Sequence, residues 1–316
     1  MNKKLIILFL ALIATFSSTA CDVCGCNLSG LYFGFLPVRN THFIGVKYSR
    51  ATFHAYIDND DYYFEDEFSD DTYQRFDLLG RFSLGKRFQV RYILPYMVNH
   101  MKGSHQNVYS SGVGDPMVMV YYSPFNTGND LSQSIMHSLN LGVGLKLPLG
   151  EFDKEDNGEL VNRNFQLGSG SLDYLLSGNY TIRYQKTGIN VESSFKINSE
   201  NNLEYRFGNQ YNISGNTFYY FEMKKASVIP FVGIYYEQAG YHENKGIREA
   251  NTGGHSLLGT LGAQVFAGKF TFNFQYQIPL KQTFNTDSFA EIEGGDRLSA
   301  GVYYSFSFGK KAVVNN

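Results

Sequence analysis

The 316-residue chain has no tryptophan, only seven prolines and only three cysteines. Its 27 Lys and Arg nearly balance its 29 Asp and Glu, so the sequence lacks the basic excess of a nucleic-acid-binding protein. Beyond residue 20 there is no run of 18 apolar residues, which excludes a conventional transmembrane helix. Because the cysteines all fall between Cys21 and Cys26, a disulfide-rich scaffold is also excluded.

The first twenty residues have the pattern of a secretory signal peptide. Lys3 and Lys4 form a basic start, an apolar core follows over residues 5–16, and small residues occupy 17–20. An N-terminal anchor helix is the alternative, but the apolar core is short for a span of about 20 residues. We therefore expect a signal peptide over 1–20, a cysteine-containing periplasmic or plug segment over 21–41, a main body over 42–308 and a tail over 309–316.

Aromatic residues and glycine are abundant, with 27 Phe, 24 Tyr and 32 Gly. Around residues 269–280, Phe270, Phe272 and Phe274 alternate with Thr271 and Asn273, and residues 297–308 repeat this period of two. Such alternation predicts strands with one apolar and one polar face. The polar face holds mainly Gly, Ser, Asn, Thr and Gln, which suit a crowded aqueous lumen, whereas the aromatic face suits lipid.

Twelve alternating segments can be placed, near 42–57, 73–84, 86–100, 112–123, 135–148, 170–185, 187–200, 210–223, 227–239, 255–267, 269–280 and 296–308. The joins alternate between short turns, such as Gly85 and Gly268, and long polar loops, such as 149–169 and 240–254. The sequence thus predicts an all-β fold, an antiparallel transmembrane β-barrel of about twelve strands. We expect it in the outer membrane of a Gram-negative-type bacterium, in contact with outer-membrane lipid.

A barrel of this size encloses a lumen intermediate between a filled eight-stranded barrel and a wide porin. The function predicted first is a channel or transporter for small molecules, with side chains of the lumen setting selectivity. The residues predicted to line the lumen are Arg75, Asp77, Arg81, Gln89, Arg91, Asn140, Lys146, Asn190, Glu192, Lys196, Asn273, Gln275 and Gln277. No oligomeric state is predicted.

The cluster Cys21, Cys24 and Cys26 allows three interpretations. Cys21 could be the lipidated first residue of a lipoprotein, although Ser18 stands where that processing prefers leucine. The thiols could bind Cu or Zn, since closely spaced thiolates suit soft metals, although no histidine completes a four-ligand zinc site. A periplasmic disulfide with one remaining cysteine is the third. The alternative function is therefore metal binding or sensing at this cluster, and no other cofactor is expected.

An acidic segment is predicted to form an external loop. Its members are Asp58, Asp60, Asp61, Glu65, Asp66, Glu67, Asp70 and Asp71. Carboxylates could collect Ca²⁺ there, but the spacing lacks the glycine and terminal glutamate of an EF-hand. A solvated charged loop is the simpler interpretation.

No motif of an enzyme stands out. Gly112–Asp115 has two glycines, but a strand follows where a dinucleotide-binding loop needs a helix. Gly168–Ser171 lacks the lysine of a phosphate-binding loop, and the seven histidines are scattered. We therefore expect no catalytic residues.

Several short motifs carry a family resemblance. They are Gly112–Asp115 at the start of a strand, residues 144–150 (GLKLPLG), residues 168–173 (GSGSLD) and residues 204–208 (EYRFG). Together they resemble a family of bacterial outer-membrane proteins named for the phenol-degradation (meta) pathway and often called transporters. The cysteine head at Cys21–Cys26 is similar to a related branch. The resemblance covers residues 42–308 and implies a β-barrel, passage of small apolar or aromatic compounds, and no catalytic residues.

Overall fold

The computed structural model describes residues 41–57, 66–104, 106–127, 134–156 and 158–308. The predicted signal peptide, the cysteine-containing segment and the tail lie outside these residues. Within them, no helix is long and apolar enough to cross a membrane. Nearly every described segment is instead an antiparallel strand or the connection between two strands.

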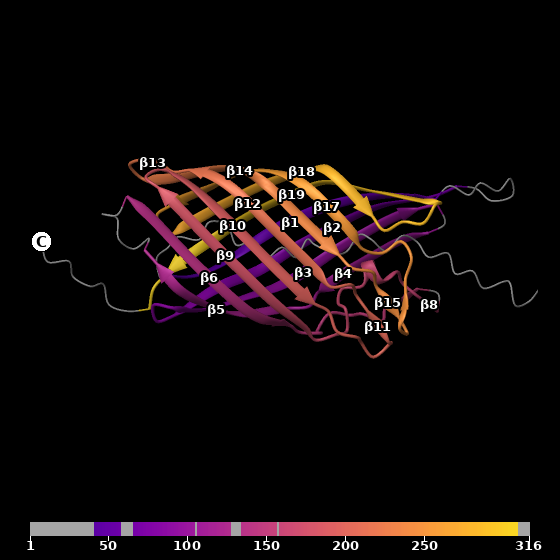
Figure 1. Ribbon diagram of the computed structural model, residues 1–316. Coiled ribbons are helices and arrows are strands. Elements are labelled where there is room, and N and C mark those ends of the chain that lie inside the picture. The colour runs from indigo at the N-terminus through magenta and orange to yellow at the C-terminus, as the bar shows by residue number, and fades with distance from the viewer. Residues whose placement is uncertain (1–40, 58–65, 105, 128–133, 157, 309–316) are drawn as a thin grey trace, which may run out of the picture.

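The strands form one closed antiparallel barrel of twelve wall strands (Figure 1). They are β1 (His42–Ile57), β2 (Glu67–Leu84), β3 (Phe88–Gly103), β4 with β5 (Asn107–Val113 and Met117–Asn126), β6 (Ile135–Lys146), β9 (Asp173–Tyr184), β10 (Thr187–Ile197), β12 (Gln210–Tyr219), β14 (Ala226–Ala239), β17 (Gly254–Ala267), β18 (Phe270–Phe284) and β19 (Ala290–Phe306). Each pairs with its neighbour in sequence, and β1 pairs with β19 to close the wall. The predicted fold and strand number are confirmed.

Closing the sheet lets the backbone N–H and C=O groups of the wall hydrogen-bond to one another within lipid, which offers them no partners. An unpaired N–H or C=O in hydrocarbon costs several kcal/mol, so a membrane-spanning sheet must have no edge. Most wall strands exceed the roughly 9–11 residues needed to cross a bilayer at a tilt, and the ribbons are visibly tilted to the barrel axis (Figure 1). Tight turns join the strands at one end, where Gly85 and Gly268 adopt φ of 68° and 60°, a conformation that glycine takes without steric cost.

The two faces of the wall differ as the alternation predicted. In β3, Gln89, Arg91 and Ile93 are buried inside, whereas Leu94 and Tyr96 are exposed outside. The exposed apolar face continues around the barrel through residues such as Val143, Val232, Leu261, Phe272 and Val302. This outer band provides the surface that contacts lipid.

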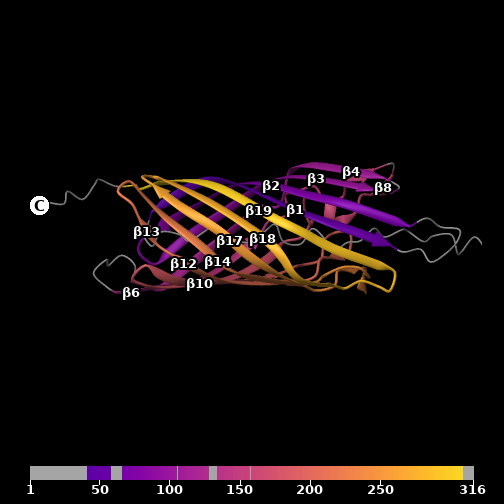
Figure 2. The same ribbon diagram turned by 90° about the horizontal axis from the view of Figure 1, so that it is seen from above.

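Toward the loop end of the barrel, exposed polar side chains replace the apolar side chains of the outer face. On β1 and β2, His54 Nδ1 lies 2.7 Å from Asp70 Oδ1, and Tyr56 Oη donates to Asp66 Oδ2 at 2.6 Å. Because both pairs are exposed and charged or polar, this part of the hairpin extends beyond the hydrocarbon layer. Figure 2 shows β1, β2 and β19 extending at that end, with β3 and β4 beside them.

This projection corrects the predicted loops. Glu67, Asp70 and Asp71, expected in an external loop, lie in strand β2, which begins at Glu67. Likewise, β18 continues to Phe284 and β19 begins at Ala290, so the loop predicted over 281–295 is only five residues long. Cross-strand pairing of β1 with β2 from Ile57–Glu67 onward gives these acidic residues backbone partners, and their charge is tolerated because the strands stand outside the lipid.

A charge placed on the outer band tests the assignment of the membrane-facing surface. We expect Val232→Arg, in the middle of β14 and 58% exposed, to destabilise the folded barrel by about 2–4 kcal/mol, the cost of Arg at the bilayer midplane. Ile247→Arg, in the short strand β16 (Ile247–Arg248) of an external loop and 73% exposed, should leave stability unchanged. The measurement is urea unfolding in liposomes, and equal effects of both variants would contradict the assignment.

Candidate functional site

The lumen face carries most of the residues predicted for it. Arg75, Asp77, Arg81, Gln89, Arg91, Lys146, Asn190, Glu192, Asn273 and Gln277 are buried, and Asn140, Lys196 and Gln275 are half-buried. All of them alternate with outward-facing neighbours along their strands. The structure brings some of them together in pairs and leaves others on separate parts of the wall.

A charged group lies on β1 and β2. Asp77, 1% exposed, accepts from Arg75 Nε through Oδ1, and its Oδ2 lies 3.5 Å from Lys47 Nζ. Lys47 was missed from the sequence because its strand alternates less regularly than the C-terminal strands. One carboxylate between two cations leaves a positive excess at this level of the lumen.

A second charged pair joins strands that are not neighbours. Arg297 on β19 donates from Nη1 and Nη2 to Glu237 on β14, at 2.8 and 2.5 Å. Such a bidentate pair is geometrically specific and stronger than a single hydrogen bond. Since β17 and β18 lie between these strands in the wall, the pair reaches across the lumen face of both.

Part of the lumen is apolar, whereas the sequence predicted a crowded aqueous lumen. Phe43, Leu79, Ile93, Met119, Tyr121, Leu175 and Tyr303 are buried and belong to one cluster that also includes Met117. Arg91 lies with its guanidinium 3.8 Å from the ring centre of Tyr121, a cation–π contact. The opposite wall presents mainly amides and hydroxyls, among them Asn190, Asn216, Thr260, Gln264 and Asn273. The passage therefore has an apolar side and a polar side.

A bulge in the wall positions an aspartate that the sequence did not single out. Tyr96 pairs with Val113 and Ile93 pairs with Met117, so two residues of β3 face the three residues Gly114, Asp115 and Pro116. An extra residue of this kind re-aims a side chain. Here it turns Asp115 toward the loop end of the lumen, where the carboxylate is 8% exposed.

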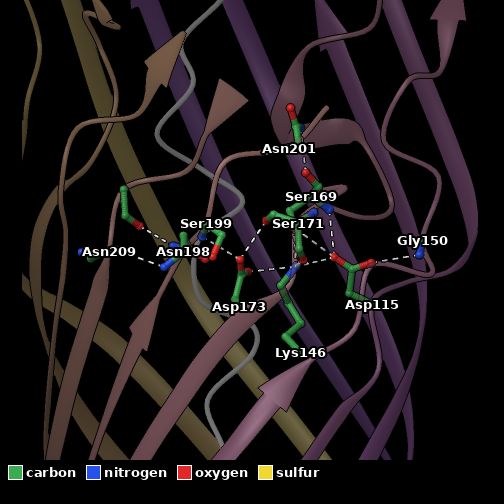
Figure 3. A network of polar contacts seen from close by, with 11 residues as sticks. Asp115, Lys146, Gly150, Ser169, Ser171, Asp173, Asn198, Ser199, Asn201 and Asn209 are labelled. Atoms are coloured by element: carbon green, nitrogen blue, oxygen red, sulfur yellow. Dashed lines mark hydrogen bonds and ion pairs between the residues drawn. The ribbon is translucent and has the colours of Figure 1, made fainter. Parts of the chain in front are cut away.

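Asp115 and Asp173 share one lysine (Figure 3). Lys146 Nζ lies 2.6 Å from Asp115 Oδ2 and 2.9 Å from Asp173 Oδ2, and it also donates to Ser169 Oγ. Asp115 accepts further from the backbone N–H of Gly150 at 2.9 Å and of Ser169 at 2.8 Å. We call Asp115, Lys146, Ser169, Ser171 and Asp173 the ion-pair network.

The ion-pair network fixes two external loops to the wall. Asp173 Oδ1 accepts from Ser171 Oγ at 2.8 Å and from the N–H of Ser199 at 3.0 Å. Asn201 Nδ2 donates to the carbonyl of Ser169 at 2.8 Å, so the loop after β10 is tied to the loop between β6 and β9 (Figure 3). Three of the motifs that carried the family resemblance thus meet at one place in space.

The loop between β6 and β9 folds into the mouth of the barrel. Phe165, 1% exposed, stacks on Tyr73 with ring centres 5.1 Å apart, and Val161 is buried in the same cluster. Beneath the loop lies a cavity of about 130 Å³, whose lining includes Arg75, Lys146 and Arg163. The loop and the cavity therefore both lie at the loop end of the lumen.

A small external sheet covers the other side of the mouth. It consists of β11 (Tyr205–Arg206), β15 (Glu243–Asn244) and β16. The Nδ1 of His242 lies 2.7 Å from Tyr205 Oη, and burial lowers the pKa of His242 from 6.5 to about 4, with Lys196 adding to the shift. The hydrogen bond from Arg206 lowers the pKa of Glu243. Strand β11 of this cover comes from the connection between β10 and β12, and β15 and β16 come from the connection between β14 and β17.

Apart from the predicted cysteine cluster, the structure offers no candidate metal site within its described residues. Among the residues that the structure describes, no group of three His, Cys, Asp or Glu side chains could hold an ion. Cys21, Cys24 and Cys26 lie outside the described residues, as do Asp58, Asp60, Asp61 and Glu65. The metal, disulfide and lipidation interpretations of the cysteines stay predictions.

Removing the shared lysine should destabilise the ion-pair network. We expect Lys146→Met to lower the free energy of unfolding by about 3–5 kcal/mol, because two buried carboxylates lose their common counter-ion. Lys86→Met, in an exposed periplasmic-side turn, is the matched control and should have no effect. Urea unfolding in liposomes measures both, and an unchanged Lys146→Met protein would show that the network contributes nothing to stability.

Acid should loosen the external sheet through His242. The unfolded ring titrates near 6.5 and the folded ring near 4, so the unfolded segment binds more protons between these values and stability falls as the pH drops through this window. The loss is about 2 kcal/mol at pH 5. Hydrogen exchange of residues 240–253 should accelerate from pH 7.5 to pH 5, after correction for intrinsic rates, and His242→Gln should abolish the difference.

Comparisons with known proteins identify the fold. No family model matches the chain, and no curated protein matches it in sequence. The crystal structure of an outer membrane channel from Pseudomonas putida F1 superposes with a TM-score of 0.61 at 16% identity, covering 89% of this chain and all of the other. The β-domain of the Bordetella autotransporter BrkA (10% identity, 83% and 99% covered, TM-score 0.43) and the monoaromatic hydrocarbon channel CymD (10%, 87% and 92%, 0.37) are more distant. The fold of this chain is that of an outer-membrane β-barrel.

Proposed function

We propose that this protein is a channel through which small molecules cross the outer membrane without chemical change. The observation that carries the proposal is the inner face, which buries at least six cationic and six acidic side chains in a barrel wall. Ionisable residues at membrane depth are costly and are retained where they line a pathway. The structural likeness to a channel of Pseudomonas putida F1 supports the same conclusion.

The passage suits small and partly apolar solutes. The aromatic cluster around Tyr121 offers an apolar side, while the amides of β10, β12 and β18 offer hydrogen bonds. The loop carrying Phe165 lies at the loop end of the route, and the Arg297–Glu237 pair lies on its wall. The thirteen lumen residues predicted from the sequence, of which Arg75 is the first and Gln277 the last, would set selectivity through their charge and through the width of the lumen. The surrounding lipid is the other expected partner.

The cysteine head adds a separate hypothesis. Cys21, Cys24 and Cys26 would belong to the branch of the resembling family that has such a head, and they could bind copper or zinc beside the barrel. Mass spectrometry of the mature N-terminus, together with metal analysis with and without the cysteines, tests this hypothesis. A bare N-terminus with a disulfide and no bound metal would remove it.

Planar-bilayer recording tests the channel. The full-length protein should conduct ions in small steps, and Phe165→Ala should increase conductance because the inward loop loses its stacking contact with Tyr73. Leu149→Ala is the control, since Leu149 belongs to the same loop and is 69% exposed. Absence of conductance, together with normal uptake of small solutes in a deletion strain, would contradict the proposed function.

A further inference from the structure

The cavity beneath the inward loop has an unusual lining. Its cationic side chains are Arg75, Lys146, Arg163 and Lys196, against the single carboxylate of Asp115. Asp77 and Asp173 lie directly behind Arg75 and Lys146, and the surroundings remain positive when they are included. A positive concavity with low-dielectric walls concentrates anions.

Three buried polar atoms on residues that line this cavity have no hydrogen-bond partner among the described residues. They are Arg75 Nη2, on a side chain 6% exposed, and Gln210 Oε1 and Asn198 Oδ1, each on a residue 3% exposed. Buried donors and acceptors are nearly always satisfied, and each exception calls for a bound group. A free guanidinium nitrogen is suited to a carboxylate oxygen, whereas Gln210 Oε1 can accept from a hydroxyl.

Apolar and aromatic side chains form another part of the lining, beside the amides of Asn164, Gln166 and Asn198. Tyr73, Phe207, Met97, Met117 and Leu167 line the same cavity. Its volume is about 130 Å³, close to the roughly 150 Å³ of an engineered apolar cavity that binds benzene. The space therefore matches one six-membered ring with a small polar substituent.

We infer that this cavity is a binding site for single-ring aromatic carboxylates on their way through the lumen. The ring would lie between the aromatic and methionine side chains, and the carboxylate would accept from Arg75 Nη2. This inference rests on the proposed channel function and specifies its substrate class. Such a solute has an apolar ring and a polar carboxylate, so it would contact both the apolar and the polar side of the lumen.

Calorimetric titration of the full-length protein in detergent tests the site with sodium benzoate. Benzyl alcohol, which keeps the ring and lacks the charge, is the matched probe. Benzoate should bind at least about tenfold more tightly than benzyl alcohol, since a hydrogen bond to a charged group contributes that much or more. Equal affinity for the two probes would overturn the inference.

Three variants locate the binding. Arg75→Gln should weaken benzoate binding by roughly tenfold to hundredfold, and Asp77 keeps Lys47 as its partner in that variant. Lys196→Gln should weaken benzoate binding as well. This second variant keeps the test valid if Arg75→Gln does not fold. Lys86→Gln is the control, because Lys86 is an exposed cation in the turn between β2 and β3, and this variant should bind benzoate like the original protein.

The outcomes separate this inference from the channel itself. Unchanged binding in both Arg75→Gln and Lys196→Gln, or equal weakening in Lys86→Gln, would refute the site. A protein that conducts ions in bilayers but fails these tests is still a channel. A protein without conductance, whose deletion also leaves uptake of small solutes normal, fails the proposed function, whatever it binds.

Discussion

Everything in this molecule depends on closing a sheet in a solvent that accepts no hydrogen bonds. The pairing of β1 with β19 removes the last free edge, and every wall strand then has two partners. Because the backbone is satisfied by closure alone, the side chains are free to differ between the two faces. The outer face is apolar for lipid, and the inner face is available for charges that a soluble sheet would place in bulk water.

The inner face uses this freedom unevenly. Cations gather on β1, β2 and β3 through Lys47, Arg75, Arg81 and Arg91, whereas β12, β17 and β18 present mainly amides and hydroxyls. Paired charges such as Arg297 and Glu237 hold long side chains against the wall. A buried ion pair is a weak source of stability, so the number of such pairs here is better explained by the passage that they surround than by folding.

The sequence was sufficient to predict the barrel, but it was insufficient to predict the contacts at the mouth of the barrel. Period-two alternation over whole strands, as at Phe270, Phe272 and Phe274, predicted fold and strand number because each residue reports its own face. Asp115 and Asp173 could not be assigned a role, since their contacts join positions 26–54 residues apart through a bulge and two loops. The acidic run near Asp70 was misread because charge usually indicates a loop, whereas here the strands continue beyond the lipid.

The arrangement of one lysine between two aspartates constrains how the sequence can change. Replacing Lys146 alone leaves two buried anions. Replacing either aspartate alone removes the acceptor of backbone N–H groups, those of Gly150 and Ser169 for Asp115 and that of Ser199 for Asp173. Only concerted exchanges avoid leaving a buried charge without its counter-ion. Divergent descendants should therefore either retain all three residues with their glycine-rich surroundings or lose them as a set, which makes this trio a marker for tracing ancestry where overall identity has decayed.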